Sequence, residues 1–267
     1  MKKLTLNEIQ ASELLLLIEF KRFCQDKGLS YSLAGGTLLG AIRHRGFIPW
    51  DDDIDVCMPR PDYERFVKSF KSDKEHIEIL SDSMGTFNSP FAKIIDISTC
   101  IESKYSKNSF NSHLWIDIFP IDGLPESTEK TVDIYRWENF YRRMLVLTDA
   151  QLGEGKTFIR RYGKYILIPI ARMYGAKRCS KKMRDIALTI PYETAEYVGI
   201  VTWGLYGVGE RMKKKEFLQK VTVTFEGEEF SAFSCWDSYL QGIYGDYMQL
   251  PPIEKRKTHD MTVFVKD

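Results

Sequence analysis

The sequence predicts an α+β fold in which a small mixed sheet is flanked by helices and followed by a mostly helical C-terminal half. Apolar residues recur at helical spacing near the start of the chain, and the pattern is helical again from Ser127. Between these regions, the acidic run Trp50–Val56 leads into Ile-Asp-Val-Cys-Met, which is typical of a buried strand, and Trp115–Gly123 is a second apolar run. We expect residues 1–125 to form the core and residues 126–267 to pack on it as one compact unit.

The first predicted element is a helix that begins at a capping box. In Thr5-Leu6-Asn7-Glu8, the Thr and Glu side chains are spaced to accept hydrogen bonds from each other's backbone N–H groups. Apolar positions continue at helical spacing through Phe23, and Gly28 suits the left-handed residue that often ends a helix. A long helix therefore precedes the first strand.

A pair of glycines follows that strand. Residues 29–34 are typical of a short strand, which leads through Gly35, Gly36 and Thr37 into a helix over Leu38–Arg43. Glycines let the backbone approach a ligand closely, and the N-terminus of a helix favours negative charge. This turn predicts a phosphate site, and an ordinary tight turn is the alternative.

Four aspartates stand within five residues of the run that begins at Trp50. In an extended strand alternate side chains face opposite sides, so Asp51, Asp53 and Asp55 share one side and the apolar residues share the other. These carboxylates repel one another unless a cation neutralises them, and a divalent metal with oxygen ligands does so. A solvated acidic turn is the alternative, but the run leads directly into an apolar strand.

Basic residues flank both of these motifs. Arg43, His44 and Arg45 form a loop between the glycines and the aspartates, where their natural partners are the phosphate oxygens of a ligand. Lys93 lies alone in the predicted strand Phe91–Ile97. It either contacts a ligand phosphate or base, or extends to the surface past its apolar neighbours.

Asp117 lies between two isoleucines in the second apolar run. A buried carboxylate without a partner costs several kcal/mol, so it needs a positive neighbour. The cation already required by Asp53 and Asp55 would complete a three-carboxylate site. Other elements expected in this half are a helix from Pro59 to about Phe70 and strands over Ile77–Leu80 and Thr99–Glu102.

Helical patterns dominate the second half. One of them, Thr157–Tyr174, combines basic residues with an apolar, aromatic-flanked run. Such a segment can lie on an anionic membrane surface, whereas a core-facing helix with a solvated basic side is the commoner arrangement. The remaining expected elements are helices over Val132–Leu147, Ser180–Ile190 and Cys235–Tyr244, and a strand over Val221–Glu226.

Composition excludes several classes of protein. The 267 residues carry a net charge of only +1, which provides no global field for nucleic acid. Five cysteines without a CxxC pair suggest free thiols rather than disulfides or a zinc site. Neither a signal peptide nor an apolar run near the ~20 residues of a membrane span is present in the sequence. We expect a cytoplasmic protein, at the inner face of the cell membrane if the basic helix contacts lipid.

Two motifs strongly resemble the signature of the LicD family. The first is Leu-Ala-Gly-Gly-Thr-Leu-Leu-Gly from Leu33, continued by Arg-His-Arg-Gly-Phe-Ile-Pro-Trp-Asp-Asp-Asp-Ile-Asp-Val from Arg43. The second is Tyr-Gly-Asp-Tyr from Tyr244, with Pro251-Pro252 and the residues from Arg256 to His259. The resemblance runs from about residue 20 to about residue 262.

This resemblance implies a nucleotidyltransferase-like catalytic core over residues 1–125. The family includes bacterial phosphocholine transferases that decorate teichoic acid or lipopolysaccharide, and relatives of fukutin and fukutin-related protein that transfer ribitol phosphate, with CDP-linked donors. Carried over by position, the glycine motif would be Gly35, Gly36 and Thr37, the paired metal ligands Asp53 and Asp55, and the third carboxylate Asp117.

The chain also departs from the pattern of the simplest nucleotidyltransferases. Its interval between Gly36 and Asp53 is longer, so Arg43, His44, Arg45 and Asp51 have no counterpart there. Asp246, Arg256 and His259 are further candidates in the C-terminal motif, although the second histidine expected beside His259 is absent.

The predicted reaction is transfer of phosphocholine or a related phospho-alcohol from a CDP-linked donor to a hydroxyl group of a cell-envelope glycan or glycolipid. Mg²⁺ or Mn²⁺ held by Asp53, Asp55 and Asp117 would neutralise the diphosphate, and Asp117 would either ligate the metal or accept the acceptor's proton. Attack on the nucleotide's α-phosphorus would instead make a nucleotidyltransferase. An alternative of another class is a non-catalytic binding protein on the same scaffold.

Choline, unlike ribitol, glycerol or ethanolamine, carries a quaternary ammonium group that favours an aromatic cage. The candidate aromatic residues are Trp50, Tyr105, Trp115, Trp203, Tyr206, Trp236 and Tyr244.

Overall fold

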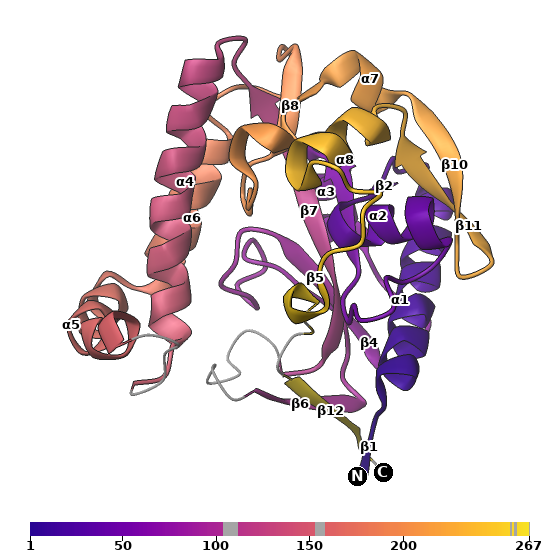
Figure 1. Ribbon diagram of the computed structural model, residues 1–267, viewed down its shortest axis with the longest axis horizontal. Coiled ribbons are helices and arrows are strands. Elements are labelled where there is room, and N and C mark those ends of the chain that lie inside the picture. The colour runs from indigo at the N-terminus through magenta and orange to yellow at the C-terminus, as the bar shows by residue number, and fades with distance from the viewer. Residues whose placement is uncertain (104–111, 153–157, 257, 259–260, 267) are drawn as a thin grey trace.

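The main sheet confirms the predicted α+β class. The structure, a computed structural model, describes residues 1–103, 112–152, 158–256, 258 and 261–266 (Figure 1). In the main sheet β3 and β7 are parallel and the other pairs are antiparallel, so the sheet is mixed. Its strand order is β2 (Ser32–Leu33), β3 (Asp55–Pro59), β7 (Leu114–Leu124), β5 (Ala92–Asp96) and β4 (Ile77–Leu80), with β8 (Tyr197–Ile200) paired to β7 and β9 (Met212–Lys213) paired to β8.

Two smaller sheets complete the strands. In one, β12 (Met261–Val265) lies between β1 (Lys2–Lys3) and β6 (Thr99–Ser103), which brings the two ends of the chain together (Figure 1). The other is the hairpin of β10 (Lys220–Phe225) and β11 (Glu228–Phe233). Strands β1, β8, β9, β11 and β12 are additions to the predicted elements.

Most helices lie on the predicted segments, although the one predicted over Ser180–Ile190 spans Ala176–Ala187 and the short helix Lys214–Leu218 was not predicted. Helix α1 has the expected capping box, and Gly28 ends it in the left-handed conformation with φ 60°. After α4, the helices α5 and α6 complete a helical region, beyond which the C-terminal half is mixed. The helices are α1 (Leu6–Lys27), α2 (Gly35–His44), α3 (Arg60–Ser69), α4 (Thr128–Asp149), α5 (Phe158–Tyr174), α6 (Ala176–Ala187), α7 (Lys214–Leu218) and α8 (Trp236–Tyr244), with short 3₁₀ turns η1 (Gly207–Glu210) and η2 (Ile253–Lys255).

The main core joins α1 and α3 to the sheet. The fully buried rings of Phe20 in α1 and Phe66 in α3 meet edge to face, with centroids 5.2 Å apart. They share one cluster of buried residues with Val56 of β3 and Ile118 of β7. Burial of this apolar surface holds the two central strands in register, at about 25 cal/mol for each Å² removed from water.

Two predicted boundaries are corrected by the structure. The strand expected from Trp50 begins only at Asp55, because the ladder of β3 with β7 starts with the pair Asp55 and Asp117. The helix expected from Leu38 begins at Gly35, so the glycines form the first turn of the helix instead of a separate turn before it.

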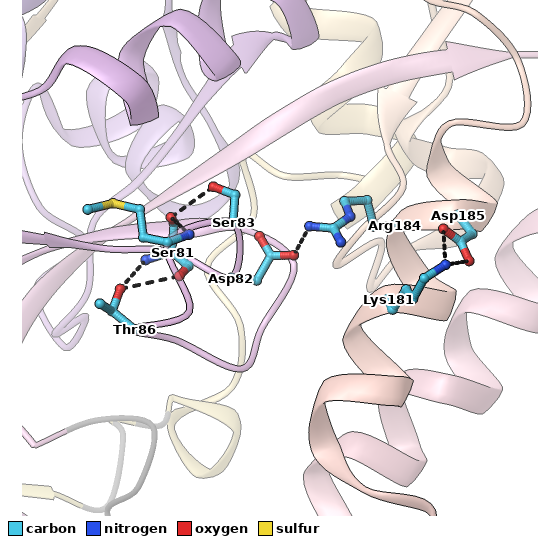
Figure 2. Close-up of polar contacts among 8 residues, drawn as sticks. Ser81, Asp82, Ser83, Thr86, Lys181, Arg184 and Asp185 are labelled. Carbon is cyan, nitrogen blue, oxygen red and sulfur yellow. Dashed lines mark hydrogen bonds and ion pairs between the residues drawn. The ribbon is translucent and has the colours of Figure 1, made fainter.

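Polar contacts attach the helical region to the rest of the molecule. Figure 2 shows Arg184 of α6 reaching Asp82 in the turn after β4, with Nη1 2.6 Å from Oδ2. The same turn is closed by Ser81, whose carbonyl accepts from the Thr86 N–H at 3.2 Å. The ion pair of Arg184 and Asp82 therefore holds α6 to the turn that follows β4.

The buried ion pair of Arg60 and Asp122 yields a test of the core. Arg60 Nε and Nη2 lie 2.6 and 2.7 Å from the two Asp122 oxygens, and both side chains are buried. We expect Asp122→Ala to destabilise the protein by about 3–5 kcal/mol, because it leaves the guanidinium buried without its counter-charge. Urea unfolding measures this loss. In the exposed pair of Lys181 and Asp185, 2.9 Å apart, Asp185→Ala is the control and should cost about 0.3–0.5 kcal/mol.

Candidate active site

One pocket gathers the two motifs from opposite ends of the chain. Its volume is about 470 Å³, within the range of small-molecule sites. The start of α2, the aspartate run before β3 and the segment after α8 form its walls. The predicted site residues that line it are Gly35, Gly36, Arg43, Asp51, Asp53, Asp55 and Asp246.

The glycines of α2 touch the carboxylates directly. A Cβ atom built on Gly35, which has φ +49°, would lie 2.8 Å from Asp55 Oδ2, and one on Gly36 would lie 2.8 Å from Asp51 Oδ2. A side chain at either position would have to displace a carboxylate, and the positive φ of Gly35 also favours glycine there, so both glycines suit close packing of the helix start against the carboxylates. Thr37 is buried, and its hydroxyl accepts from the Asp55 N–H at 2.8 Å, so it holds β3 to α2.

The alternation predicted for the aspartate run is retained although the strand starts late. Asp51, Asp53 and Asp55 all line the pocket, while Ile54 is fully buried in the core. Asp52, on the opposite side, is buried as well.

Strand register places Asp117 beside Asp55. The two residues are paired across the parallel strands β3 and β7, and Asp117 is paired on its other side with Lys93 of β5. Lys93 Nζ lies 2.9 Å from Asp117 Oδ1, and the indole N–H of Trp115 donates to Oδ2 at 3.2 Å. Asp117 therefore has a cationic partner within the protein.

Lys93 does not extend to the surface. Its residue is only 4% exposed, which makes that interpretation of the sequence wrong, and its Nζ lies 4.1 Å from the centre of the Trp115 ring. Burial lowers the pKa of Lys93 below its ordinary value, and the neighbouring carboxylates of Asp117, Asp55 and Asp53 offset only part of this effect. A lysine that is buried among carboxylates supplies positive charge to this edge of the sheet.

The electrostatics of the pocket suit a hard divalent cation with oxygen ligands. Burial raises the pKa of Asp55 well above its ordinary value, and the carboxylates of Asp53, Asp117 and Asp51 raise it further. A bound cation would relieve this repulsion. No three or more Asp, Glu, His or Cys side chains converge closely enough to hold a metal ion in the part of the chain that the structure describes, and the three-carboxylate metal site stays a prediction.

Of the basic residues of the first motif, only Arg43 lines the pocket. Arg43 lines the pocket, and its Nη1 donates to the carbonyl of Tyr247 at 2.6 Å, which ties α2 to the C-terminal motif. Its Nε donates to Nε2 of His44 at 2.9 Å, and burial lowers the pKa of His44. Arg45 is exposed at the end of α2 and does not line the pocket.

The C-terminal motif reaches the pocket through several residues. The guanidinium carbon of Arg256 lies 4.6 Å from the centre of the Trp50 ring, and its Nε donates to the carbonyl of Pro251 at 3.0 Å. His259 and Tyr105 lie outside the described residues. Of the candidate cage residues, Trp50, Tyr206 and Tyr244 line the pocket.

Glu13 of α1 is a buried carboxylate near the aspartates that the sequence did not single out. It is fully buried, and among the residues that the structure describes neither of its carboxylate oxygens has a hydrogen-bond partner. Burial raises its pKa well above the ordinary value, and the nearby charges of Asp53, Asp52 and Asp51 raise it further. In the sequence Glu13 occupies an ordinary helical position, and only the packing of α1 brings it towards the aspartates.

Known proteins that are similar to this chain belong to the family that its two motifs resemble. Residues 28–150 match the family described as LicD/FKTN/FKRP, nucleotidyltransferase domain. The chain is 36% identical, over 97% of its own length and 97% of the relative's, to the lipopolysaccharide cholinephosphotransferase LicD of Haemophilus influenzae. A shorter stretch of 46 residues, covering 16% of this chain and 15% of the relative, is 41% identical to an uncharacterised protein of Rickettsia typhi.

The ion pair of Asp117 and Lys93 leads to a sharp prediction. Asp117→Asn removes the partner of a buried ammonium group, so we expect a loss of about 3–5 kcal/mol in unfolding free energy without added metal. The double variant Lys93→Met with Asp117→Asn should recover most of this loss, because neither member of the ion pair is then left charged without the other. Urea unfolding with and without Mg²⁺ measures both. A single variant as stable as wild type that has lost stabilisation by Mg²⁺ would make Asp117 a metal ligand and not a structural partner.

Because burial raises the pKa of Glu13, we expect the free energy of unfolding to depend on pH. Its folded pKa lies above the ordinary value of 4.5, so its contribution to stability is complete below about pH 4.5 and is lost as the pH rises towards the folded pKa. We expect Glu13→Gln to be more stable than wild type at neutral pH, with a gap that grows by about 1.4 kcal/mol for each pH unit within this window.

Urea unfolding in metal-free buffer between pH 4.5 and pH 8 measures this gap, and Glu75→Gln, at an exposed position, controls for the loss of charge. A Glu13→Gln variant that is less stable than wild type throughout would mean that Glu13 is ionised and paired with a cation.

Proposed function

We propose that this chain, which belongs to the LicD family, transfers phosphocholine from a CDP-linked donor to a hydroxyl group of a lipopolysaccharide or related cell-envelope glycan such as a teichoic acid precursor. The observation that carries the proposal is the single pocket in which glycines, aspartates and aromatic residues from both motifs meet. The similarity to a lipopolysaccharide cholinephosphotransferase over almost the whole of both chains supports it.

The donor's diphosphate would lie against the start of α2. The positive end of the helix dipole and the Arg43 guanidinium both favour phosphate oxygens. Gly35 and Gly36 allow the phosphates to come close to the backbone, as they already do for Asp55 and Asp51. Lys93, beside Asp117, would contribute positive charge from the adjacent strand.

Asp53 and Asp55 would hold Mg²⁺ or Mn²⁺. When bound, the metal would neutralise charge on the diphosphate and on the departing CMP. Asp117 would act as a third ligand or as the group that accepts the proton of the acceptor hydroxyl. Either role needs the carboxylate in the position that register with Asp55 gives it.

Aromatic side chains favour choline among the possible alcohols. Tyr206 and Tyr244 line the pocket and meet edge to face, with centroids 5.3 Å apart. The ring of Trp50 is already covered by Arg256, so the tyrosine pair is the better candidate for a trimethylammonium group.

Incubation with CDP-choline, CDP-ethanolamine, CDP-glycerol and CDP-ribitol, with Mg²⁺ and a glycan acceptor, tests the proposal. Phosphocholine transfer releases CMP, because the acceptor attacks the phosphorus that carries choline. Release of phosphocholine instead would show attack on the nucleotide's phosphorus and make the protein a nucleotidyltransferase. The absence of turnover and of any thermal shift with these donors and Mg²⁺ would favour the non-catalytic alternative.

Asp53→Asn and Asp55→Asn should each reduce CMP release by about 1,000-fold or more, because several kcal/mol of charge stabilisation depend on these ligands. The fold should be retained, since each change also removes repulsion among the carboxylates. Asp26→Asn, at an exposed position at the end of α1, is the matched control and should keep wild-type turnover. Full activity of either site variant at saturating Mg²⁺ would contradict the assignment.

Tyr206→Leu should raise KM for CDP-choline by about tenfold, because a cation–π contact contributes roughly 0.5–2 kcal/mol. The KM for CDP-glycerol, which has no cationic group, should be unchanged in the same variant. Steady-state CMP release with both donors measures the difference. An equal rise for the two donors would indicate a general effect on the pocket and not a choline site.

A further inference from the structure

Helix α5 carries an apolar face that points away from the protein. Most of its exposed apolar side chains recur three or four residues apart and therefore lie along one side of the helix, with Leu167, also exposed, beside them. Ile166 is 69% exposed and Met173 is 80% exposed, whereas Ile168, on the other side, is 1% exposed. The residues of this face, which we call the α5 face, are Tyr162, Tyr165, Ile166, Pro169, Ile170 and Met173.

The position of α5 in the fold matches this pattern. Figure 1 shows α5 at the lower end of α4, seen almost end-on and far from the main sheet. Ile168 and Ala171 are its buried residues, and Arg172 donates to the carbonyls of Thr148 and Ala150 at the end of α4. The helix is thus attached by one side and presents the other to its surroundings.

Positive charge is concentrated around the same helix. Residues 155–184 contain ten lysines or arginines and no aspartate or glutamate, although the net charge of the whole chain is +1. Lys181 and Arg184 are ion-paired with Asp185 and Asp82, but Lys177, Arg178 and Lys182 are exposed. The sequence around α5 and α6 therefore differs in charge from the rest of the molecule.

We propose that the α5 face docks on an anionic lipid bilayer. Apolar and aromatic side chains on one side of a helix, within a strongly basic segment, are the features of helices that lie in the plane of a membrane interface. Among the described helices none is long and apolar enough to cross a membrane, so α5 would lie along the surface. A second copy of the chain would fit the apolar side chains but would place two such basic segments against each other, which charge repulsion opposes.

The tyrosines on this face strengthen the assignment. Tyr162 and Tyr165 are exposed and stack with centroids 6.4 Å apart. Their rings have an apolar body and a polar hydroxyl, and such side chains favour the boundary between headgroups and acyl chains. Two exposed tyrosines beside an exposed isoleucine and methionine therefore suit a membrane interface better than water.

Flotation of the purified full chain with vesicles tests the docking surface. We expect binding to phosphatidylcholine vesicles that contain phosphatidylglycerol, weak binding to pure phosphatidylcholine, and release at high salt. The double variant Ile166→Glu with Met173→Glu should weaken binding at least about tenfold, because it removes two exposed apolar anchors. Leu15→Glu, at a 55% exposed position of α1, is the matched control and should bind as wild type.

A charge variant tests the electrostatic part separately. Lys177→Gln with Arg178→Gln should weaken binding about fivefold for each charge removed, and Lys68→Gln with Lys71→Gln, both exposed on another part of the surface, should not. Circular dichroism and melting temperature confirm that each variant is folded.

Wild-type protein that does not float with anionic vesicles, or that floats equally well in the Ile166 and Met173 variant, overturns the proposal. Sedimentation that shows a dimer converted to a monomer by this variant, without vesicle binding, makes the face an interface between copies and also overturns it. The assay measures no turnover, so its result is independent of the enzymatic proposal.

Discussion

Repulsion between carboxylates is the constraint on which this structure depends. Asp55 and Asp117 stand side by side on the two central strands, and Asp53 and Asp51 extend the negative charge into the pocket. Burial strengthens such repulsion because the surroundings screen charge poorly. Positive charge nearby offsets part of this repulsion. It comes from the start of α2, the buried ammonium of Lys93 and the guanidinium of Arg43. The arrangement favours any ligand that brings additional positive charge to the aspartates.

Features that depend on a few neighbouring residues were predictable from the sequence. The capping box of α1 and the glycine at its end need only the spacing of Thr5, Glu8 and Gly28, and the structure has both. The placement of alternate aspartates in the pocket was also predictable, although only Asp55 of the run belongs to a strand. The apolar runs of the central strands predicted a buried sheet, and the resemblance to the LicD family implied that it would be mixed.

Features that depend on distant residues were not predictable. Nothing near Lys93 in the sequence identifies Asp117 as its partner, since the pair results from the register of β5 with β7. Glu13 resembles any other glutamate of an amphipathic helix until α1 is packed over the aspartates. Tyr206 was one of several candidate aromatic residues in the sequence, and only the fold shows that it lines the pocket whereas Trp203 and Trp236 do not.

The strand β12 has a consequence for how the chain is made. It lies between β1 and β6, so residues 2–3 have no strand to pair with until residues 261–265 have been synthesised. At the ribosome's rate of about 5–20 residues per second, the start of the chain waits on the order of ten seconds or more for its neighbour. Segments that line the pocket, such as Tyr244 and Tyr247, emerge only shortly before β12. A nascent chain therefore displays its aspartates long before the residues that complete the pocket have been made, and the pocket is completed late in biosynthesis.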